Sequence, residues 1–322
     1  TNHLLAAPAD RDKGQPIQLL IGHIDTVWPQ GTLATMPFRS DQRRLYGPGV
    51  LDMKGGLVQM LFALRALRDL AIGPAATPVV FINSDEETGS RDSTRHLVRL
   101  GQAASRAFVL EPADGPTGAL KTARKGVGRF RVAVRGRAAH AGLSPGDGAS
   151  AILEMSHLVQ RLFELNAPDR GVTVNVGTID GGLGANVVAP RVVAEVDVRT
   201  WTEADATRVS QSIEALTVTN PQCAITIEGG FNRPPMELTP RNLRLWDCAE
   251  TLAEQLGIAL DRSEVGGGSD ANTTSQHAAT LDGLGAVGHG AHADDEQAVI
   301  DAMPERAALL AGLLASPLGA RG

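Results

Sequence analysis

Alternating strand and helix patterns over the first 110 residues constrain the fold of this chain most strongly. Apolar runs at 17–22, 78–84 and 106–110 predict three buried strands. Helical patterns lie between them, and strands that alternate with helices form parallel sheets covered on both faces. The sequence therefore predicts an α/β domain with a mostly parallel sheet and flanking helices.

The helical patterns between these strands have the spacing of single helix faces. A helix is predicted over 53–70, since apolar residues recur there at i, i+3, i+4 and i+7 spacing: Leu57, Met60, Leu61, Leu64 and Leu67. Ser90 is predicted as the N-cap of a second helix, which runs to Leu100 and stops at Gly101.

The pattern changes near Lys125 and returns after Pro234-Pro235. Residues 128–134 alternate like a half-buried strand, and further strands are expected at 172–179, 192–198 and 224–228. Helices are expected over 149–165 and 203–216. Gly229-Gly230 is expected to mark the return to the alternating strand and helix pattern of the first part of the chain. Helices over 239–256 and from Pro304 onward then complete the chain. We therefore expect one domain in two parts, 1–123 and 236–322, with an inserted α+β domain at 124–235.

Composition excludes some classes of function. The chain has 322 residues, 43% hydrophobic and 20% charged, with a net charge of −6, which is typical of a soluble globular protein. Nucleic-acid and membrane-surface binding need clustered positive charge, and the basic stretch 121–125 is too short to supply it. We expect no nucleic-acid partner and no membrane. The two cysteines do not form a disulfide framework.

Histidine and acidic residues follow the predicted strands. His23 and Asp25 come after the first strand, Asp85-Glu86-Glu87 after the second, and Glu111 after the third. Asp52 stands at the start of the 53–70 helix, among glycines that allow close backbone packing. Ligands gather beyond the carboxyl ends of strands in open α/β sheets. Because buried carboxylates repel one another, divalent cations between them are the simplest explanation.

The types of ligand narrow the choice of metal. Imidazole and carboxylate without thiolate suit Zn²⁺, Mn²⁺ or Co²⁺, and two neighbouring metals need one bridging carboxylate. A second histidine is required, and His289 and His292 are the candidates. A metal-binding histidine usually donates its other ring N–H to a carboxylate, a role that Asp25 would fill for His23. An unligated carboxylate beside the metals could act as general base.

These residues stand in motifs that resemble those of the M20 metallopeptidases, and most closely the glutamate carboxypeptidase branch. The motifs occur in family order over nearly the whole chain: His23-Ile-Asp25-Thr, Tyr46-Gly-Pro-Gly49, Asp52-Met-Lys-Gly-Gly, Asp85-Glu86-Glu87-Thr-Gly-Ser90, Glu111-Pro112, Arg137-Ala-Ala-His140-Ala-Gly, Gly266-Gly-Gly-Ser-Asp270 and Gly-Ala-His292.

The resemblance implies a role for each metal-site residue. Asp52 would bridge two Zn²⁺ ions per subunit, with Co²⁺ or Mn²⁺ as possible substitutes. His23 and Glu111 would bind one ion, and Glu87 and His292 the other. Glu86 would be the general base and Asp25 the partner of His23. His292 is preferred to His289 because its Gly-Ala-His context matches the family.

The resemblance makes the inserted domain a lid through which a homodimer forms. It gives His140 a role in stabilising the oxyanion in the neighbouring subunit's site, with a hinge or surface histidine as the alternative. The candidates for contacts with the substrate's carbonyl and carboxylate groups are Asn186, Arg199 and Arg233. Arginine suits this role because its guanidinium group can donate two hydrogen bonds to one carboxylate. Strand-end salt bridges are the alternative for both arginines.

We therefore expect a dinuclear metal hydrolase that cleaves an amide or peptide bond next to a free carboxylate. Its substrate would be a small peptide or an N-acyl amino acid. An N-acyl-amino-acid deacylase or a dipeptidase with the same site is the alternative, and a non-catalytic homologue is the rival of another class. A cytoplasmic location is expected, with periplasmic or secreted left open. The family usually has several tens of residues before the first metal-binding strand, whereas 22 precede His23. An absent amino-terminal segment would remove a helix, alone or together with a strand, but no metal ligand.

Overall fold

The structure, a computed structural model, describes residues 2–318, and these form two compact units. Unit 1 comprises residues 2–124, Met236–Val265 and 269–318, and unit 2 comprises Lys125–Pro235 and Gly266–Gly268. Within residues 2–318, no helix combines the length and the apolar character needed to cross a membrane.

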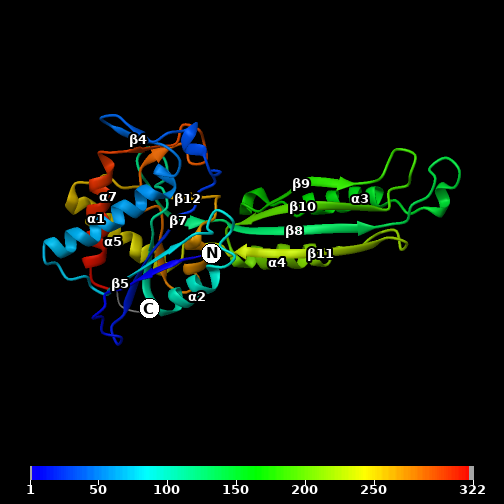
Figure 1. Ribbon diagram of the computed structural model, residues 1–322. Coiled ribbons are helices and arrows are strands. Elements are labelled where there is room, and N and C mark those ends of the chain that lie inside the picture. The colour runs from blue at the N-terminus through cyan, green and yellow to red at the C-terminus, as the bar shows by residue number, and fades with distance from the viewer. Residues whose placement is uncertain (1, 319–322) are drawn as a thin grey trace. The chain divides into compact units, whose positions relative to one another are not determined.

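The central sheet of unit 1 is mostly parallel (Figure 1). Its strands, in spatial order, are β1 (Leu4–Ala6), β5 (Thr77–Asn83), β2 (Ile17–His23), β6 (Ala104–Val109) and β13 (Ala279–Leu281). β2 runs parallel to both β5 and β6, β13 runs parallel to β6, and only the edge strand β1 is antiparallel. The predicted α/β class is confirmed.

Helices cover both faces of this sheet. Leu20, Val80 and Phe108 face a core formed with α1 (Gly55–Asp69), α5 (Pro240–Leu256) and α7 (Ala302–Ala315). Their strand neighbours Leu19 and Val79 face the opposite side, towards α2 (Thr94–Ala103) and α6 (Asp270–Thr274). Every residue of β2 is buried, so the sequence of this strand is mostly apolar and does not alternate between apolar and polar residues.

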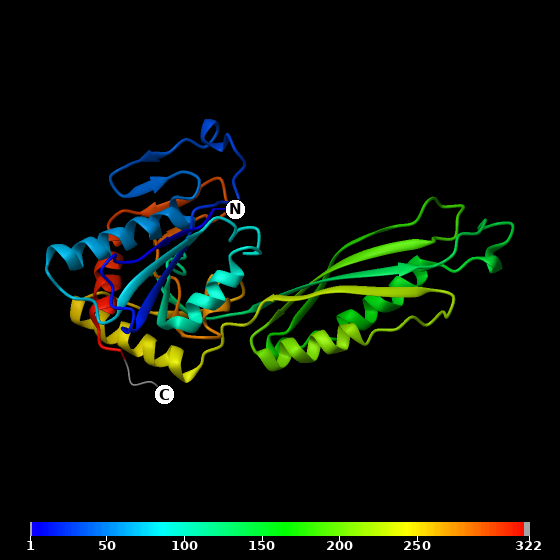
Figure 2. The same cartoon turned by 60° about the horizontal axis from the view of Figure 1, so that its bottom comes forward.

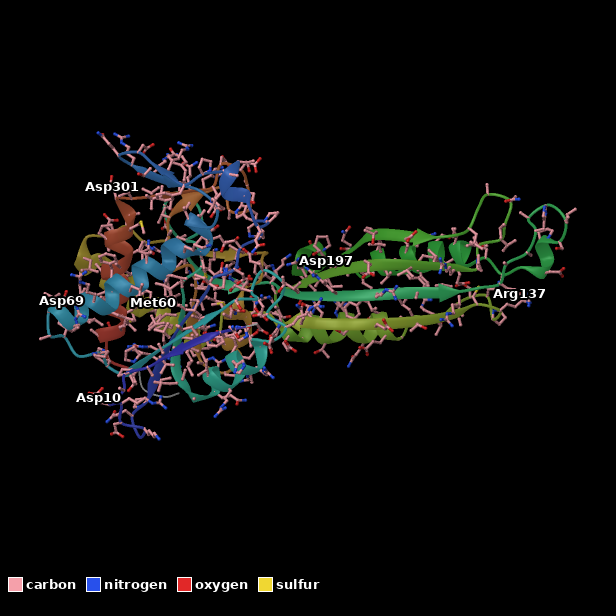
Figure 3. The ribbon with its side chains drawn as sticks, viewed as in Figure 1. Asp10, Met60, Asp69, Arg137, Asp197 and Asp301 are labelled. Carbon is pink, nitrogen blue, oxygen red and sulfur yellow. The ribbon has the colours of Figure 1, made fainter. Side chains whose placement is uncertain are left out.

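Three predictions about the helices were wrong in detail. Leu61 is 62% exposed, and Ala63 takes part in the core instead. Met60 of α1, which is labelled in Figure 3, belongs to the same core. α2 begins at Thr94 rather than after Ser90, and it continues past Gly101. Ser90 has a positive φ of 52°, and its hydroxyl donates a hydrogen bond to Asp270, so tertiary contact overrides its capping preference.

Shorter strands complete unit 1. β7 (Leu120–Arg124) pairs in parallel with β12 (Arg262–Val265), so the basic stretch 121–125 belongs largely to a buried strand. A small antiparallel sheet has the order β14 (Gly288–His289), β15 (Gln297–Val299), β4 (Arg44–Tyr46) and β3 (Arg39–Ser40). Its first two strands flank the segment that contains His292.

Unit 2 is an antiparallel sheet with helices on one face (Figure 2). The strands, in spatial order, are β11 (Ala224–Arg233), β8 (Gly126–Arg135), β10 (Arg191–Thr200) and β9 (Thr173–Gly181), and the helices are α3 (Ala151–Phe163) and α4 (Glu203–Glu214). Phe130, Val132 and Val134 of β8 face the helices, whereas the alternating residues such as Arg131 are exposed. Gly229-Gly230 does not end the sheet, because both glycines pair with β8 inside β11.

Close backbone approach explains one glycine of α1 and supports a prediction. A Cβ atom at Gly56 would overlap the carbonyl oxygen of Leu110, directly before Glu111. We expect Gly56→Ala to lower the free energy of unfolding by about 1–3 kcal/mol, although alanine is the better helix former. The measurement is the midpoint of urea unfolding. Gly73→Ala, where a Cβ meets no atom within 4 Å, is the matched control, and equal midpoints for the two variants would contradict the packing argument.

Candidate metal centre

The residues predicted to form a site lie at the carboxyl edge of the unit 1 sheet. His23 is the last residue of β2 and is 1% exposed. Glu86 and Glu87 stand in the loop after β5, and Glu111 lies two residues beyond β6, also buried. These strands are parallel neighbours, so their carboxyl ends bring the three loops together.

The Asp52 carboxylate lies between two imidazoles. Its Oδ1 is 3.2 Å from His23 Nε2, and its Oδ2 is 3.4 Å from His292 Nε2. Glu111 Oε1 is 3.5 Å from the same His23 nitrogen, and Glu87 Oε2 is 3.3 Å from the same His292 nitrogen. Each oxygen of Asp52 thus faces one histidine, and a second acid lies near the same histidine nitrogen: Glu111 at His23 and Glu87 at His292.

His289 does not join this arrangement. It is exposed, and its Nε2 lies 3.7 Å from Asp295 Oδ2. His292 adopts a φ of 63°, which is uncommon outside glycine and often marks a constrained functional residue. Of the two candidates, the structure therefore brings His292 to the cluster.

A buried acid holds the turn that carries Asp52. The turn η2 (Val50–Lys54) precedes α1, and the Asp52–Met53 peptide bond within it is cis. The Glu296 carboxylate accepts hydrogen bonds from the backbone N–H groups of Gly49, Leu51 and Asp52 at 2.8–3.0 Å. It also accepts one from the Trp28 indole at 2.9 Å, and Glu296 is only 1% exposed. Three of the four donors belong to the backbone of residues 49–52, so the Glu296 carboxylate holds this segment in place.

This role of Glu296 leads to a prediction about metal affinity. Glu296→Ala would leave three backbone N–H groups without their acceptor, so Asp52 would no longer be held between the histidines. We expect the affinity for metal to fall about 10–100-fold. Titration of the protein with Zn²⁺ by calorimetry measures it. Glu305→Ala, at the beginning of α7, is the control, and an unchanged affinity in Glu296→Ala would contradict the positioning role.

The loop with Glu86 and Glu87 is anchored from several sides. Asp25 Oδ2 accepts a hydrogen bond from the Glu87 backbone N–H at 3.0 Å. Asp270 accepts one from the Ser90 hydroxyl and another from Asn83 at the end of β5, both at 2.5 Å. Around His23, the Nδ1 atom lies 3.0 Å from the backbone oxygen of Asp25 and 3.5 Å from its carboxylate. Asp25 therefore links His23 to the acidic loop, and its carbonyl oxygen is the nearer partner of the imidazole.

Buried cations lie beneath the acids. Arg124 donates a hydrogen bond to Asp282 at 2.6 Å, and its Nη2 is 4.0 Å from Glu111 Oε2. Burial lowers the pKa of Lys121 and of Lys54, although nearby carboxylates, Asp52 among them, oppose this shift. Lys54 and Glu111 stand in the family motifs, but the sequence does not show which charged groups lie near them.

The electrostatics of the cluster favour positive charge between the acids. Burial opposes the charged imidazole of His23, but Asp25, Asp52 and Glu111 outweigh it and raise the pKa of His23. The hydrogen bond with Asp52 raises the pKa of His292 to about 9. Burial raises the pKa of Glu87 to about 7, and repulsion from Asp52 adds to the shift. Despite its own burial, Asp52 has a pKa well below the usual range because both histidines favour its charged form.

The donor set fits divalent cations. Ligand atoms of His23, Glu86 and Glu111 lie within 4.8 Å of one another, and so do those of His23, Asp52 and Glu87. Among the described residues, Glu87 Oε1 is buried without a hydrogen-bond partner, so this acid has an oxygen to offer. Imidazole and carboxylate without thiolate suit zinc, manganese or cobalt.

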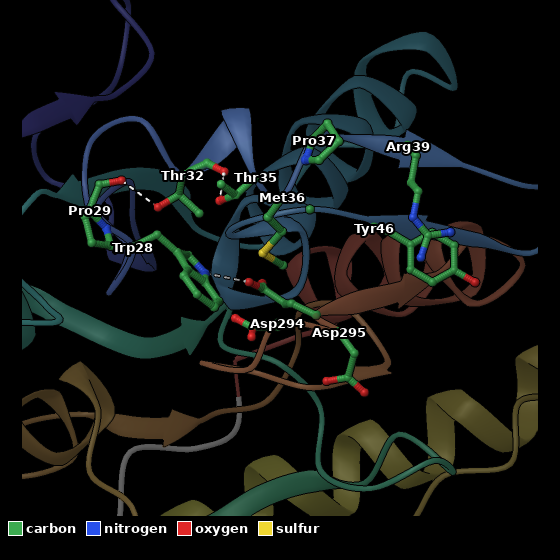
Figure 4. Close-up of a pocket in the computed structure, with 12 residues that line it drawn as sticks. Trp28, Pro29, Thr32, Thr35, Met36, Pro37, Arg39, Tyr46, Asp294 and Asp295 are labelled. Atoms are coloured by element: carbon green, nitrogen blue, oxygen red, sulfur yellow. Dashed lines mark hydrogen bonds between the residues drawn. The ribbon is translucent and has the colours of Figure 1, made fainter.

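A cavity of about 440 Å³ adjoins the Glu296 carboxylate (Figure 4). Trp28, Met36, Pro37 and Tyr46 supply apolar surface, and Asp294 and Asp295 supply charge. The Trp28 indole bonds to Glu296 at its wall, and the Arg39 guanidinium stacks over the Tyr46 ring at 3.6 Å. The cavity therefore lies next to the turn that carries Asp52.

The remaining predicted residues belong to unit 2. His140 and Asn186 lie close together there, because the backbone N–H of Ala141 donates to the carbonyl oxygen of Asn186. Both side chains are exposed, and His140 Nδ1 accepts hydrogen bonds from Gly142 and Leu143. Arg199 donates two hydrogen bonds to Asp197, at 2.7 and 2.9 Å, which is the salt bridge left open as the alternative. Arg233 is the last residue of β11 and is 6% exposed.

Sequence reasoning missed the supporting residues Glu296, Asp270 and Asp282, which are 1%, 2% and 0% exposed. Asp270 ends a recognised motif and Glu296 follows another, whereas Asp282 belongs to none, and a sequence does not show that a carboxylate is buried. The nearest signal was the spacing of Glu296, four residues after His292.

Comparisons with known proteins agree with this geometry. The model of peptidase family M20/M25/M40 matches residues 19–316. Carboxypeptidase G2 of Pseudomonas sp. (strain RS-16) is 29% identical over 309 residues, 94% of this chain and 74% of that protein. Succinyl-diaminopimelate desuccinylase of Stenotrophomonas maltophilia (strain R551-3) is 28% identical over 91% of this chain and 82% of that protein.

Solved structures share the fold. Aminopeptidase PepT from Bacillus cereus superimposes with a TM-score of 0.78 at 23% identity, over 97% of this chain and 84% of that chain. M20 peptidases depend on two metal ions, and the cluster around Asp52 offers ligands of the required types. Since the family model spans the strand that ends in His23 and the segment that contains His292, the chain belongs to peptidase family M20/M25/M40 and is a metallopeptidase of the hydrolase class.

Proposed function

We propose that this chain is a glutamate carboxypeptidase-type enzyme that cleaves an amide or peptide bond next to a free carboxylate, with two Zn²⁺ ions per subunit. The observation that carries the proposal is the Asp52 carboxylate, whose two oxygens each face a different histidine at 3.2 and 3.4 Å. A carboxylate that faces two imidazoles in this way suits a bridging ligand.

The proposed ligand set follows from the distances to these histidines. His23 and Glu111 would hold one ion, Glu87 and His292 the other, and Asp52 both. When bound, the two cations would polarise the scissile carbonyl group and lower the pKa of water towards neutrality. Asp25 orients His23 through its carbonyl and carboxylate oxygens, and Glu296 orients Asp52.

Glu86 is the proposed general base. Its neighbour Glu87 faces His292, whereas Glu86 belongs to the group with His23 and Glu111. The Glu86 carboxylate would take the proton of the attacking water and deliver it to the leaving nitrogen. This shuttle makes the departing amine a neutral leaving group.

Unit 2 is the proposed lid and dimerisation domain. We assign Asn186, Arg199 and Arg233 to contacts with the carbonyl and carboxylate groups of the substrate, although Asp197 already engages two donors of Arg199. Arg199 remains a candidate through its remaining donor atoms. His140 would stabilise the oxyanion in the site of a partner subunit. Analytical ultracentrifugation tests the homodimer, and a monomer at all concentrations would contradict it.

The experiment for this function is a substrate panel with the metal-reconstituted protein. Acyl-glutamates, N-succinyl and N-acetyl amino acids, and dipeptides are compared with and without chelator. We expect the highest kcat/KM for acyl-glutamates, abolished by chelator and restored by Zn²⁺. The relation to a desuccinylase makes an N-acyl-amino-acid deacylase the second candidate, and higher kcat/KM for acetyl or succinyl substrates would establish it instead. No hydrolysis of any substrate by the zinc-loaded protein would favour a non-catalytic homologue.

A further inference from the structure

A second cavity, of about 540 Å³, lies at the opposite edge of the unit 1 sheet from the metal-binding cluster. It is lined by Pro16 before β2, Ala104 at the start of β6 and Ala279 at the start of β13. The metal ligands follow the other ends of these parallel strands. β2 has seven residues, so the two sites are separated by about 20 Å of sheet.

The lining of this cavity is positively charged. It contains Arg106, Arg241, Arg244 and His277, but no aspartate or glutamate. The arginine–carboxylate ion pairs within residues 2–318 involve other arginines. In a chain with a net charge of −6, three guanidinium groups are thus gathered around one cavity without a carboxylate counter-charge from its walls.

The fold satisfies only part of the hydrogen-bonding capacity of these groups. Arg106 is buried, and it donates to Gln18 and to backbone oxygens near the end of α7. Arg241 donates to the backbone oxygen of Ser275 at the end of α6, but its Nε is buried without a partner. Carbonyl groups at a helix terminus amount to about half a negative charge, so they do not neutralise a full cation.

Arg241 and Arg244 are placed so that both can donate hydrogen bonds to one ligand. Arg241 and Arg244 stand three residues apart on α5, so their side chains share a helix face. Cys248, four residues further, lines the same cavity, together with apolar groups such as Leu245 and Pro317. A cavity with arginines on one wall and apolar surface beside them suits a small anion of phosphate or carboxylate type.

We propose that this cavity binds a small anion with two or more negative charges, held by Arg241 and Arg244 at a site separate from the metal centre. Phosphate groups and polycarboxylates share the required chemistry, and the experiment includes both. The buried charge of Arg106 adds to the favourable potential. The site would allow an anionic metabolite to bind the enzyme without occupying its catalytic cluster.

Cys248 provides a local readout that does not depend on hydrolysis. Iodoacetate and iodoacetamide have nearly the same size but differ in charge, so the ratio of their alkylation rates at Cys248 reports the potential in the cavity. The full, zinc-loaded chain is labelled, and the modified residue is identified by peptide mass spectrometry. Cys223, buried in unit 2, is the internal reference.

We expect Arg241→Gln/Arg244→Gln to reduce the iodoacetate-to-iodoacetamide ratio at Cys248 about tenfold. Arg244→Gln alone, at an exposed residue, should shift it less and in the same direction. Arg65→Gln/Arg68→Gln has the same spacing on α1, where both arginines pair with Asp69, and should leave the ratio unchanged. Inorganic phosphate or citrate should slow the alkylation of Cys248 by iodoacetamide in the wild-type chain but not in the double variant.

Three outcomes would overturn the proposal. An unchanged ratio in the double variant would show that these arginines do not create the potential. Failure of both reagents to label Cys248 would show that the cavity is closed to solutes. Absence of protection by phosphate and by citrate, at concentrations up to about 10 mM, would show that no such anion binds with useful affinity.

Discussion

Replacing Glu86 with glutamine is expected to lower kcat about a thousandfold while both metal ions remain bound. Glutamine keeps the size of the side chain, but its amide does not accept a proton from water near neutral pH. The proposed ligand set does not include Glu86, so the affinity for metal should stay close to that of the wild-type chain. Steady-state kinetics on the best substrate and the metal content after dialysis measure the two quantities separately.

The metal content makes this experiment decisive. The Glu86 carboxylate shares a group of candidate ligand atoms with His23 and Glu111. If Glu86→Gln loses metal together with activity, Glu86 is a ligand and the general base must be another residue. A fall in kcat of less than about tenfold would also exclude it as the base. Glu250→Gln, an exposed acid of α5, is the matched control and should change neither quantity.

Asp52→Asn should have the second large effect, because it removes the charge that faces both histidines. An asparagine side chain retains one oxygen, and an NH₂ group replaces the other. The variant therefore no longer offers an anionic oxygen to each histidine. In the wild-type chain, the two Asp52 oxygens lie 3.2 Å from His23 Nε2 and 3.4 Å from His292 Nε2. We expect bound metal to fall from two ions to one or fewer per chain. We also expect kcat/KM to fall at least about a thousandfold, since metal-ion catalysis supplies several kcal/mol.

The control for Asp52→Asn is Asp69→Asn at the end of α1, where the carboxylate pairs with the exposed Arg65 and Arg68. Metal content is measured after dialysis against metal-free buffer, and folding is checked by circular dichroism. A folded Asp52→Asn chain that retains two ions with wild-type affinity would rule out a bridging role. The pairing of ligands across Asp52 would then need to be reassigned.

Unit 1 shows how much of a fold can be predicted from local pattern. The runs around Leu20, Val80 and Phe108 have consecutive apolar residues, a pattern that occurs mainly in parallel strands buried on both faces. Once those strands were predicted, His23, Glu86 and Glu111 could be identified as candidate site residues, because the end of each apolar run can be recognised in the sequence. The registers between strands and the exact ends of α1 and α2 did not follow, since they depend on neighbours distant in the chain.

Other features had no local signal. Residues 121–125 look like a short charged loop, yet Lys121 and Arg124 are 9% and 4% exposed in β7. Their burial is possible because Asp282, about 160 residues further along, accepts a hydrogen bond from Arg124.

The sequence by itself determined the α/β class, the family motifs and the types of ligand atom that this protein offers to a metal. Those properties are local, because they depend on the residues next to each other along one strand or turn. Only the tertiary structure decided that Asp52 lies between His23 and His292, and that Glu296 accepts three hydrogen bonds from the backbone of the segment that carries Asp52. The physical reason is that burial and ion pairing depend on distances between segments some 240 residues apart, which only the packing of the sheet and its helices sets.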